Sequence, residues 1–186
     1  MKKLWIDTNL KDNGPYQSPI KKEVKLPLSI RYKIFKKKKG EKYVAHFLKN
    51  LSDNPYITHK RPNNKILIYK KQNIVYKLIY NSEQIVNEVG MQLLAKKYQG
   101  KCNIKIPKIF WWGKAKNVGV IAMQFASGII LSKLSIDFKK KIKLVDDKLN
   151  IYNIYHNDLN FSNIFYDKDI FWIIDFGQAT TSPNRI

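Results

Sequence analysis

Cysteine is nearly absent from this chain of 186 residues, and Cys102 is its single representative. One cysteine excludes an internal disulfide, and without a cluster of cysteines and histidines no zinc site is predicted. No apolar run approaches the roughly 18 residues of a membrane-spanning helix, and no apolar stretch follows the N-terminal lysines as it does in a signal peptide. We therefore expect an intracellular, cytoplasmic protein, with a viral protein in a host cell left open.

Acidic residues are scarce as well, with 14 Asp and Glu against 35 Lys and Arg and a formal net charge of +21. Such a charge attracts polyanions, so it favours RNA, a ribosome, an acidic protein or an anionic membrane surface as partner. The lysines are spread widely, however, and the abundance of Lys, Ile, Asn and Tyr also fits compositional drift in an A/T-rich genome. Both explanations stay open at this point.

The N-terminal 54 residues look different from the rest. Prolines up to Pro27 predict an irregular extension, and Lys21–Lys42 is strongly basic. For this basic run we favour a solvated loop over a segment that contacts phosphates. Apolar residues at helical spacing in Glu41–Leu51 predict a short helix. His46 on this helix is expected at the surface or at the edge of the core, not as a ligand.

From Pro55 onward the pattern predicts regular elements, and 44% hydrophobic residues are enough for a core. Ile66–Tyr69 and Ile74–Tyr80 are rich in strand-forming residues and flank a polar turn, which predicts a β-hairpin. A helix over about 82–98 follows, with an N-cap signal before it and a glycine after it. Two strands and a second helix complete the pattern, at 104–112, 118–125 and 138–152.

The most informative segment is Ile154–Gly177. It reads His-x-Asp-x-x-x-x-Asn and then, after a short apolar stretch, Asp-Phe-Gly, and Asp158, Asn163 and Asp175 stand at the Asp and Asn positions of these two motifs. Phosphoryl transfer needs a carboxylate beside the accepting hydroxyl, and an amide and a second carboxylate are suited to hold Mg²⁺ against the phosphates of ATP. The three residues in this order are far more specific than either motif alone.

A strand–turn–strand unit is predicted between Asn163 and Asp175. β-Branched and aromatic residues lie on both sides of the turn signal Asp-Lys-Asp at 167–169. Such a hairpin brings its two ends to one edge, where two metal ligands would meet. In the alternative interpretation Asp158 and Asn163 are turn or cap residues and Asp175 ends a strand, but this leaves the order unexplained.

With these motifs, the chain resembles the protein kinase-like superfamily over roughly residues 55 to 180. The resemblance implies an α+β, bilobal fold with an antiparallel-sheet N-lobe and a reduced helical C-lobe. It divides the chain into three parts: a basic N-terminal extension (1–54), a kinase-like N-lobe (55–125) and a truncated kinase-like C-lobe (126–186).

The resemblance also implies a charged pair in the first lobe. Lys77 corresponds to the strand lysine that grips the ATP phosphates, and Glu88 to its helix partner, because one buried charge needs the other. The alternatives are that Lys77 is one of many solvent-facing lysines and that Glu83 is the partner. We prefer Glu88, since Glu83 is close to Lys77 in sequence and sits where it favours the helix dipole.

The segment from Ile121 to Gly128 resembles the hinge of this superfamily. Met123 then stands at the gatekeeper position, and the backbone of Gln124, Phe125 and Ala126 would bind adenine. The implied cofactors are ATP and Mg²⁺.

Among kinases, the chain is most similar to small atypical members: RIO proteins, lipopolysaccharide kinases, aminoglycoside-type phosphotransferases and the small kinases of a tRNA-modification complex. Asn157 stands where most eukaryotic kinases have arginine, so activation through a phosphorylated loop that pairs with this arginine is not expected. His156 is expected to support the loop structurally and not to act as a base.

Two departures from the family pattern matter. No glycine-rich loop precedes Lys77, and the corresponding residues 59–65 have Lys60, Arg61 and Lys65, whose charges would replace backbone donors to phosphate. The sequence also ends nine residues after Gly177. We therefore expect a partner, an oligomer or the N-terminal extension to complete the lobe, or a chain that binds without catalysing.

The leading hypothesis is an ATP- and Mg²⁺-dependent phosphotransferase, and specifically an atypical serine/threonine protein kinase. Asp158 would orient or deprotonate the acceptor hydroxyl, Asn163 and Asp175 would hold Mg²⁺, and Lys77, fixed by Glu88, would hold the phosphates. Its partners would be a protein substrate or an activating protein. The alternatives are a kinase-like binding module that docks on a kinase, a ribosome or RNA, and a small-molecule kinase.

Overall fold

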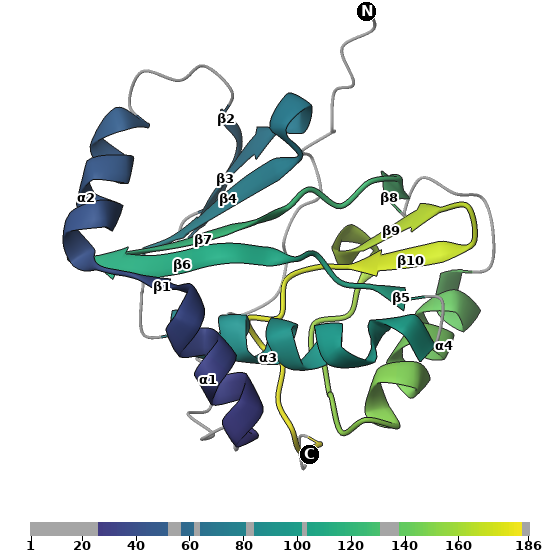
Figure 1. The fold of residues 1–186 in the computed structure, drawn as a ribbon. Helices are drawn as coiled ribbons and strands as arrows, with labels where there is room; N and C mark the ends of the chain where they lie inside the picture. Colours follow the sequence, from purple (N-terminus) through teal and green to yellow (C-terminus); the bar gives the residue numbers. More distant parts are fainter. Residues whose placement is uncertain are drawn as a thin grey trace, which may run out of the picture.

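The computed structural model describes residues 26–51, 57–61, 64–80, 84–101, 104–130 and 138–183. In these ranges the chain forms two β-sheets with helices packed against them (Figure 1). None of the helices in the described ranges is long and apolar enough to cross a membrane.

The larger sheet has six strands and forms most of the first lobe. Their order is β1 (Lys38–Lys39), β6 (Ile109–Ala115), β7 (Val118–Gln124), β4 (Ile74–Ile79), β3 (Asn64–Tyr69) and β2 (Ile57–Arg61). β3 and β4 form the predicted hairpin, in which Ile66 pairs with Lys77. The turn ends at Asn73, whose φ of 56° lies in the left-handed region that asparagine tolerates.

Part of the basic N-terminal run is a helix, and the prediction of a solvated loop there is wrong. α1 (Leu28–Lys37) leads into β1, which pairs in parallel with β6. Ile30 and Ile34 lie one turn apart and are buried in the core that also contains α3 (Ile85–Tyr98). The indole Nε1 of Trp112 donates a hydrogen bond to the backbone oxygen of Ile34 at 2.8 Å. These residues therefore belong to the body of the first lobe.

The predicted short helix is present as α2 (Glu41–Asn50), and it covers the outer face of the larger sheet. Val44 is fully buried there. It packs with four buried residues of the sheet: Leu67, Leu78, Ala115 and Val120. His46 is exposed and within hydrogen-bond distance of Asn50, as expected for a surface residue.

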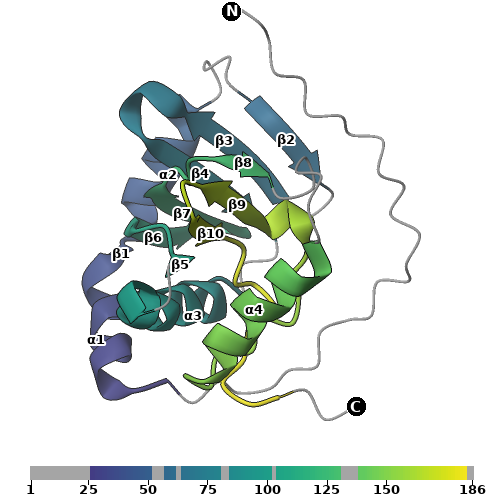
Figure 2. The ribbon, with the colours of Figure 1, turned by 90° about the vertical axis from the view of Figure 1, so that its right-hand side faces the viewer.

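α3 lies between α1 and α4 (Phe138–Asn150), beneath the inner face of the larger sheet (Figures 1 and 2). All residues from Glu88 to Ala95 are buried. Both α3 and α4 were predicted from their apolar periodicity. The main core of the molecule is formed around α3, with contributions from α1, α4 and both sheets.

The smaller sheet belongs to the second lobe. Its strand order is β5 (Ile104–Lys105), β10 (Ile170–Ile173), β9 (Ile164–Asp167) and β8 (Ile129–Ile130). β9 and β10 form the strand–turn–strand unit that the sequence predicts. β5 lies in the segment predicted as N-lobe but pairs in parallel with β10, so the chain enters the second sheet before the predicted hinge. The fold is α+β with two lobes, as predicted.

Candidate active site

Lys77 lies in the middle of β4 on the inner face of the sheet. It pairs with Ile121 of β7 on one side and with Ile66 of β3 on the other. Its neighbours Tyr76 and Leu78 point to the opposite face, where they pack in the cluster beneath α2. Because side chains alternate along a strand, this register directs Lys77 towards the core between the lobes. Its side chain is only 6% exposed, which excludes the alternative of a solvent-facing lysine.

The ammonium group of Lys77 contacts two carboxylates. Nζ lies 2.8 Å from Oε1 of Glu88 and 2.7 Å from Oδ1 of Asp175. Burial alone would lower the pKa of Lys77, but the two carboxylates outweigh it and raise this pKa above its usual value. Lys77 therefore stays charged, and the pairing with Glu88 that the sequence predicts is formed. Glu83 lies outside the described residues.

The two carboxylates are not equivalent. Burial raises the pKa of Glu88, and Lys77 only partly offsets this. Burial also acts to raise the pKa of Asp175, but the adjacent Lys77 charge and its hydrogen bond hold this pKa below the usual value. Asp175 is the more accessible partner, with a side chain 27% exposed against 4% for Glu88. Lys77 thus keeps Asp175, the more accessible of the two carboxylates, ionised.

Asp175 lies two residues beyond the end of β10 and has a φ of 62°, in the left-handed region. This conformation is uncommon for residues other than glycine, although aspartate is among those that adopt it. Gly177 passes close to the pair: a Cβ at this position would lie 3.4 Å from Asp175 Oδ1 and 3.5 Å from Glu88 Oε2. The turn therefore brings the carboxylate of the second lobe to the lysine of the first.

Asp158 is held by two amide side chains. Asn163 Nδ2 donates to the backbone oxygen of Asp158 at 2.8 Å and to its Oδ2 at 3.1 Å. Asn160 Nδ2 donates to Oδ1 of Asp158 at 2.9 Å. The sequence did not single out Asn160. Its position two residues after the aspartate is the sequence signal that could have identified it. From this position it also caps the short turn Phe161–Asn163, because its side chain accepts from the backbone N–H of Ser162.

A backbone hydrogen bond joins the two motifs. The N–H of Ile174, the residue before Asp175, donates to the carbonyl of Asn163 at 3.0 Å. His156 supports the same junction, because its Nε2 donates to the carbonyl of Ile174 at 3.0 Å. Burial lowers the pKa of His156, which is therefore neutral and buried, as expected of a structural residue. Its other ring nitrogen, Nδ1, is buried without a partner among the described residues.

Asn157 ties the loop to the residues that follow Gly177. Its Nδ2 donates to the backbone oxygen of Gln178 and to Oγ1 of Thr180, both at 3.0 Å. Two backbone hydrogen bonds between Tyr155 and Thr180 reinforce this contact. The sequence identified Asn157 only as a replacement for arginine. Its asparagine side chain holds the following segment directly, without a phosphate.

The proposed hinge differs in detail from the expectation that the whole backbone of 124–126 is available to adenine. The N–H of Gln124 donates to the carbonyl of Lys108 at 2.8 Å, and the N–H of Phe125 donates to the carbonyl of Asn73 at 3.1 Å. Two of the three amide groups are thus used within the protein. Met123 is buried at the end of β7, and Ala126 is buried just beyond it.

The loop that would cover phosphates lies between β2 and β3. β2 and β3 pair antiparallel, with Lys60 opposite Lys65. The side chains of Lys60 and Arg61 lie outside the described residues, so the predicted role of these two charges has no structural description. Lys65 is partly buried on β3.

Comparisons with known proteins agree with this geometry. Residues 100–185 match the family model of the RIO domain. This part of the chain is thus similar to a family of atypical protein kinases. The matched range contains Asp158, Asn163 and Asp175 but neither Lys77 nor Glu88, so the first-lobe half of the site is located by the structure alone.

No curated protein matches the chain. Among 443 matching chains of solved structures is WbdD, described as a co-crystal structure of WbdD and kinase inhibitor LY294002. The similarity has a TM-score of 0.47 at 18% identity and covers 68% of this chain and 33% of that chain. This chain thus spans about a third of the length of that solved chain.

The residues present fit ATP and Mg²⁺. No three His, Cys, Asp or Glu side chains in the described ranges gather into a metal site. Mg²⁺ in kinase sites, however, typically takes only one or two protein ligands and completes its shell with phosphates and water. Asn163 uses its Nδ2 twice towards Asp158, which leaves Oδ1 as the oxygen that would ligate Mg²⁺. The backbone bond between Asn163 and Ile174 connects this residue to the turn that carries Asp175. A buried lysine is the complementary group for phosphate.

Proposed function

We propose that this chain is an ATP- and Mg²⁺-dependent phosphotransferase that transfers a phosphoryl group to a serine or threonine hydroxyl of a protein. The observation that carries the proposal is the position of Lys77, which lies between Glu88 and Asp175 at 2.8 and 2.7 Å. This contact joins the predicted phosphate-binding strand to the predicted metal-binding loop, over 98 positions of sequence. A buried charge triad of this kind is costly to a fold that does not use it.

In the proposed site each residue has one task. Lys77 binds phosphate oxygens, and Glu88 keeps it in place. Asp175 and Oδ1 of Asn163 hold Mg²⁺, which would neutralise charge on the transferred group. Asp158 orients the acceptor hydroxyl and accepts its proton. The amides that hold the Asp158 carboxylate fix its position, which is the main contribution that a protein makes to phosphoryl transfer.

The match to the RIO domain supports a protein as acceptor, because this family is one of atypical protein kinases. A small-molecule kinase would share all five residues and differ only in the acceptor pocket. The molecule that receives labelled phosphate distinguishes the two hypotheses. A protein kinase labels a protein, whereas a small-molecule kinase labels an amino sugar or a lipid-linked sugar.

A binding module without catalysis is the second candidate. Two observations favour it: two hinge amides, at Gln124 and Phe125, are used inside the protein, and the sequence before Lys77 has no glycine-rich loop. In this case the charge triad would be a structural element only. ATP with Mg²⁺ would then neither turn over nor raise the melting temperature.

The test is turnover of γ-labelled ATP with Mg²⁺, together with autophosphorylation and the melting temperature with and without nucleotide. Asp158→Ala and Asp175→Ala are compared with the wild type, and Asp147→Ala is the matched control. Asp147 is an exposed carboxylate on α4, and its ion pair among the described residues is with Lys143 on the same helix. We expect loss of turnover in the two site variants and full turnover in the control. Equal turnover in all four proteins would overturn the assignment.

A further inference from the structure

The positive charge of the chain is not evenly distributed. Residues 28–125 contain 21 Lys and Arg but only four Asp and Glu, whereas residues 126–186 contain eight Lys and Arg and seven Asp and Glu. Compositional drift in a genome would enrich lysine in both halves of a chain alike. The excess charge therefore belongs to the first lobe, and this argues for a function located there.

Five lysines, four of them in this lobe, gather where α1 packs against α3 and β6 and where Lys96 of α3 reaches the carbonyl of Ile106 between β5 and β6. We call them the lysine cluster: Lys33, Lys37, Lys96, Lys105 and Lys108. Lys108 immediately precedes β6 and acts on both Lys37 of α1 and Lys96 of α3. The pKa of Lys37 is lowered by burial and then by Lys108 and Lys33, and the pKa of Lys96 is lowered by burial and then by Lys108 and Lys105. Like charges that lower one another's pKa repel unless an anion lies among them.

The cluster has no counter-charge of its own. Among the described residues up to 130 the only carboxylates are Glu41 and Glu88. Glu88 is bonded to Lys77 in the core, and Glu41 accepts from the backbone N–H of Lys116 in the β6–β7 turn. None of the five lysines forms an ion pair with any residue that the structure describes.

At least one of the charges is fixed in position. Lys96 is partly buried, and its Nζ donates to Oε1 of Gln99 at 3.0 Å and to the carbonyl of Ile106 at 2.8 Å. An ammonium group held in this way has less rotamer freedom to lose on binding. It suits a phosphate at a defined place better than the diffuse charge of a lipid surface, which long and mobile lysines reach by snorkelling.

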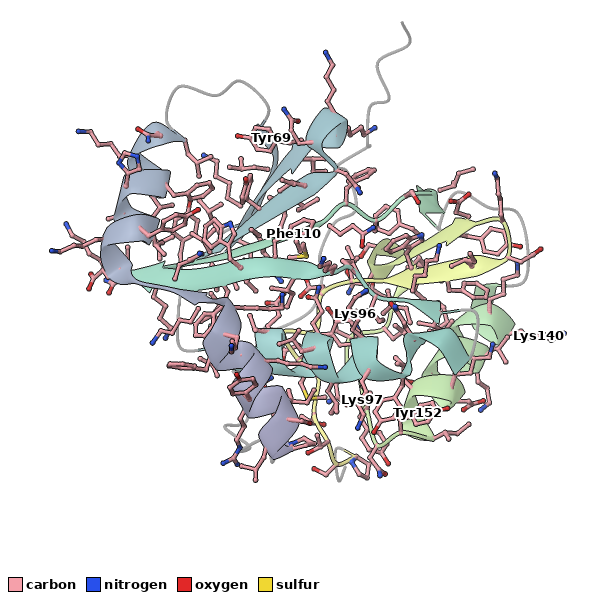
Figure 3. The ribbon with its side chains drawn as sticks, in the orientation of Figure 1. Tyr69, Lys96, Lys97, Phe110, Lys140 and Tyr152 are labelled. Atoms are coloured by element: carbon pink, nitrogen blue, oxygen red, sulfur yellow. The ribbon has the colours of Figure 1, made fainter. Side chains whose placement is uncertain are left out.

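Exposed aromatic rings accompany the lysines. Phe110 on β6 is 38% exposed, and Nζ of Lys108 lies 5.9 Å from its ring centroid. In Figure 3, Phe110 is labelled on β6 and Lys96 on the neighbouring α3. On α1, Phe35 is 74% exposed. Aromatic faces among lysines are the pattern by which proteins bind single-stranded nucleic acids, since bases stack on the rings while phosphates contact the cations.

We propose that the lysine cluster with Phe110 binds single-stranded RNA. Phosphates of the strand contact Lys33, Lys37, Lys96, Lys105 and Lys108, and an unpaired base stacks on Phe110. The surface lies on the first lobe except for Lys105 on β5 of the smaller sheet, and none of its side chains belongs to the triad of Lys77, Glu88 and Asp175. The inference is therefore independent of the proposed phosphotransferase activity.

The probe is a fluorescein-labelled, 20-nucleotide oligouridylate, whose anisotropy is titrated with the full chain at several salt concentrations. The cluster variant carries Lys33→Gln, Lys37→Gln, Lys105→Gln and Lys108→Gln. Its matched control removes the same charge from four exposed lysines elsewhere: Lys42→Gln, Lys71→Gln, Lys116→Gln and Lys168→Gln. Melting temperatures establish that both variants fold.

We expect the cluster variant to bind at least tenfold more weakly than the wild type, and the control less than threefold more weakly. The slope of log K against log salt should become shallower by about 0.7 for each phosphate that the protein no longer neutralises, in the cluster variant alone. Phe110→Ala should weaken binding about tenfold and leave the salt slope unchanged, because stacking releases no counterions.

Three results would overturn the proposal. Equal losses of affinity in the cluster variant and the control would mean attraction by net charge only. Unchanged affinity in Phe110→Ala would exclude base stacking. Binding to vesicles that contain phosphatidylserine, combined with no measurable binding of the RNA, would assign the surface to a membrane instead.

Discussion

Nζ of Lys77 lies 2.7 Å from Oδ1 of Asp175, a residue 98 positions further along the chain. This contact connects the middle of a first-lobe strand to the turn that follows the last strand of the second lobe. Because Lys77 also holds Glu88 at 2.8 Å, one cation pairs with two carboxylates from two elements. The stability of the junction between the lobes and the geometry of the candidate site therefore depend on the same atoms.

The first prediction concerns this buried pair. Lys77→Met leaves Glu88 buried without a cation and should lower the free energy of unfolding by about 3–5 kcal/mol. The double variant Lys77→Met with Glu88→Leu replaces both charges by apolar groups and should recover most of this loss. Urea denaturation of the wild type, Lys77→Met, Glu88→Leu and the double variant measures the coupling free energy between the two side chains. Additive effects would show that the two side chains do not interact in solution.

The second prediction concerns pH. Burial lowers the pKa of His156 below its ordinary value of 6.5. Below pH 6.5 the unfolded chain binds a proton that the folded chain does not, so stability falls as pH decreases from about 7 towards the folded-state pKa. The slope reaches at most about 1.4 kcal/mol per pH unit. We expect this slope in the free energy of unfolding between pH 7 and 5.5.

His156→Gln removes the titrating group and keeps a donor for the carbonyl of Ile174, so the slope should become shallower in this variant. His46→Gln, which changes an exposed histidine on α2, is the matched control and should retain the wild-type slope. The same slope in the wild type and in His156→Gln would exclude His156 as its source.

Local signals account for what could be predicted from the sequence. The β3–β4 hairpin, α3 and α4 each have an apolar pattern of their own, and the β9–β10 unit has a clear turn signal. The spacing of Asp158, Asn163 and Asp175 placed these residues on two loops that the structure joins through Ile174 and Asn163. Glu88, the partner of Lys77 that the resemblance implied, lies 2.8 Å from it, whereas the contact of Lys77 with Asp175 was not predicted.

Interactions between distant segments account for most of what was missed. α1 has a narrow apolar face, Ile30 and Ile34, within a lysine-rich stretch. This face is buried because α3 and Trp112 pack against it. β1 has two residues and exists only through its parallel pairing with β6. Asn160 and Asn157 bind through turn geometry that no periodicity encodes.

The third prediction follows from Asn157, which has a φ of 60° and donates two hydrogen bonds to the residues after Gly177. Asn157→Gly keeps the backbone conformation and removes the side chain, at a cost of about 1 kcal/mol in the free energy of unfolding. Asn157→Ala should be less stable than Asn157→Gly by about another 1 kcal/mol, because alanine is strained at positive φ.

Hydrogen exchange locates the effect. The amide of Thr180 donates to the carbonyl of Tyr155 at 2.9 Å, and its exchange should accelerate in both Asn157 variants. If this amide exchanges at the wild-type rate in Asn157→Gly, the segment after Gly177 is held by its backbone bridge alone, and the side chain of Asn157 is not required.

The last prediction tests how the N-terminal elements dock on the first lobe. Gly113 of β6 faces β1 and α2 so closely that a Cβ would lie 2.8 Å from the backbone oxygen of Lys39 and 2.5 Å from Cγ2 of Val44. The backbone of Lys39 can make room for this Cβ only if β1 leaves its register with β6. Gly113→Ala should therefore lower the free energy of unfolding by about 1–3 kcal/mol, as overpacking does. At Gly100 a Cβ meets nothing within 4 Å, so Gly100→Ala should be neutral or slightly stabilising. Equal stability of the two variants in urea denaturation would mean that β1 and α2 are not packed on β6 in solution as they are here.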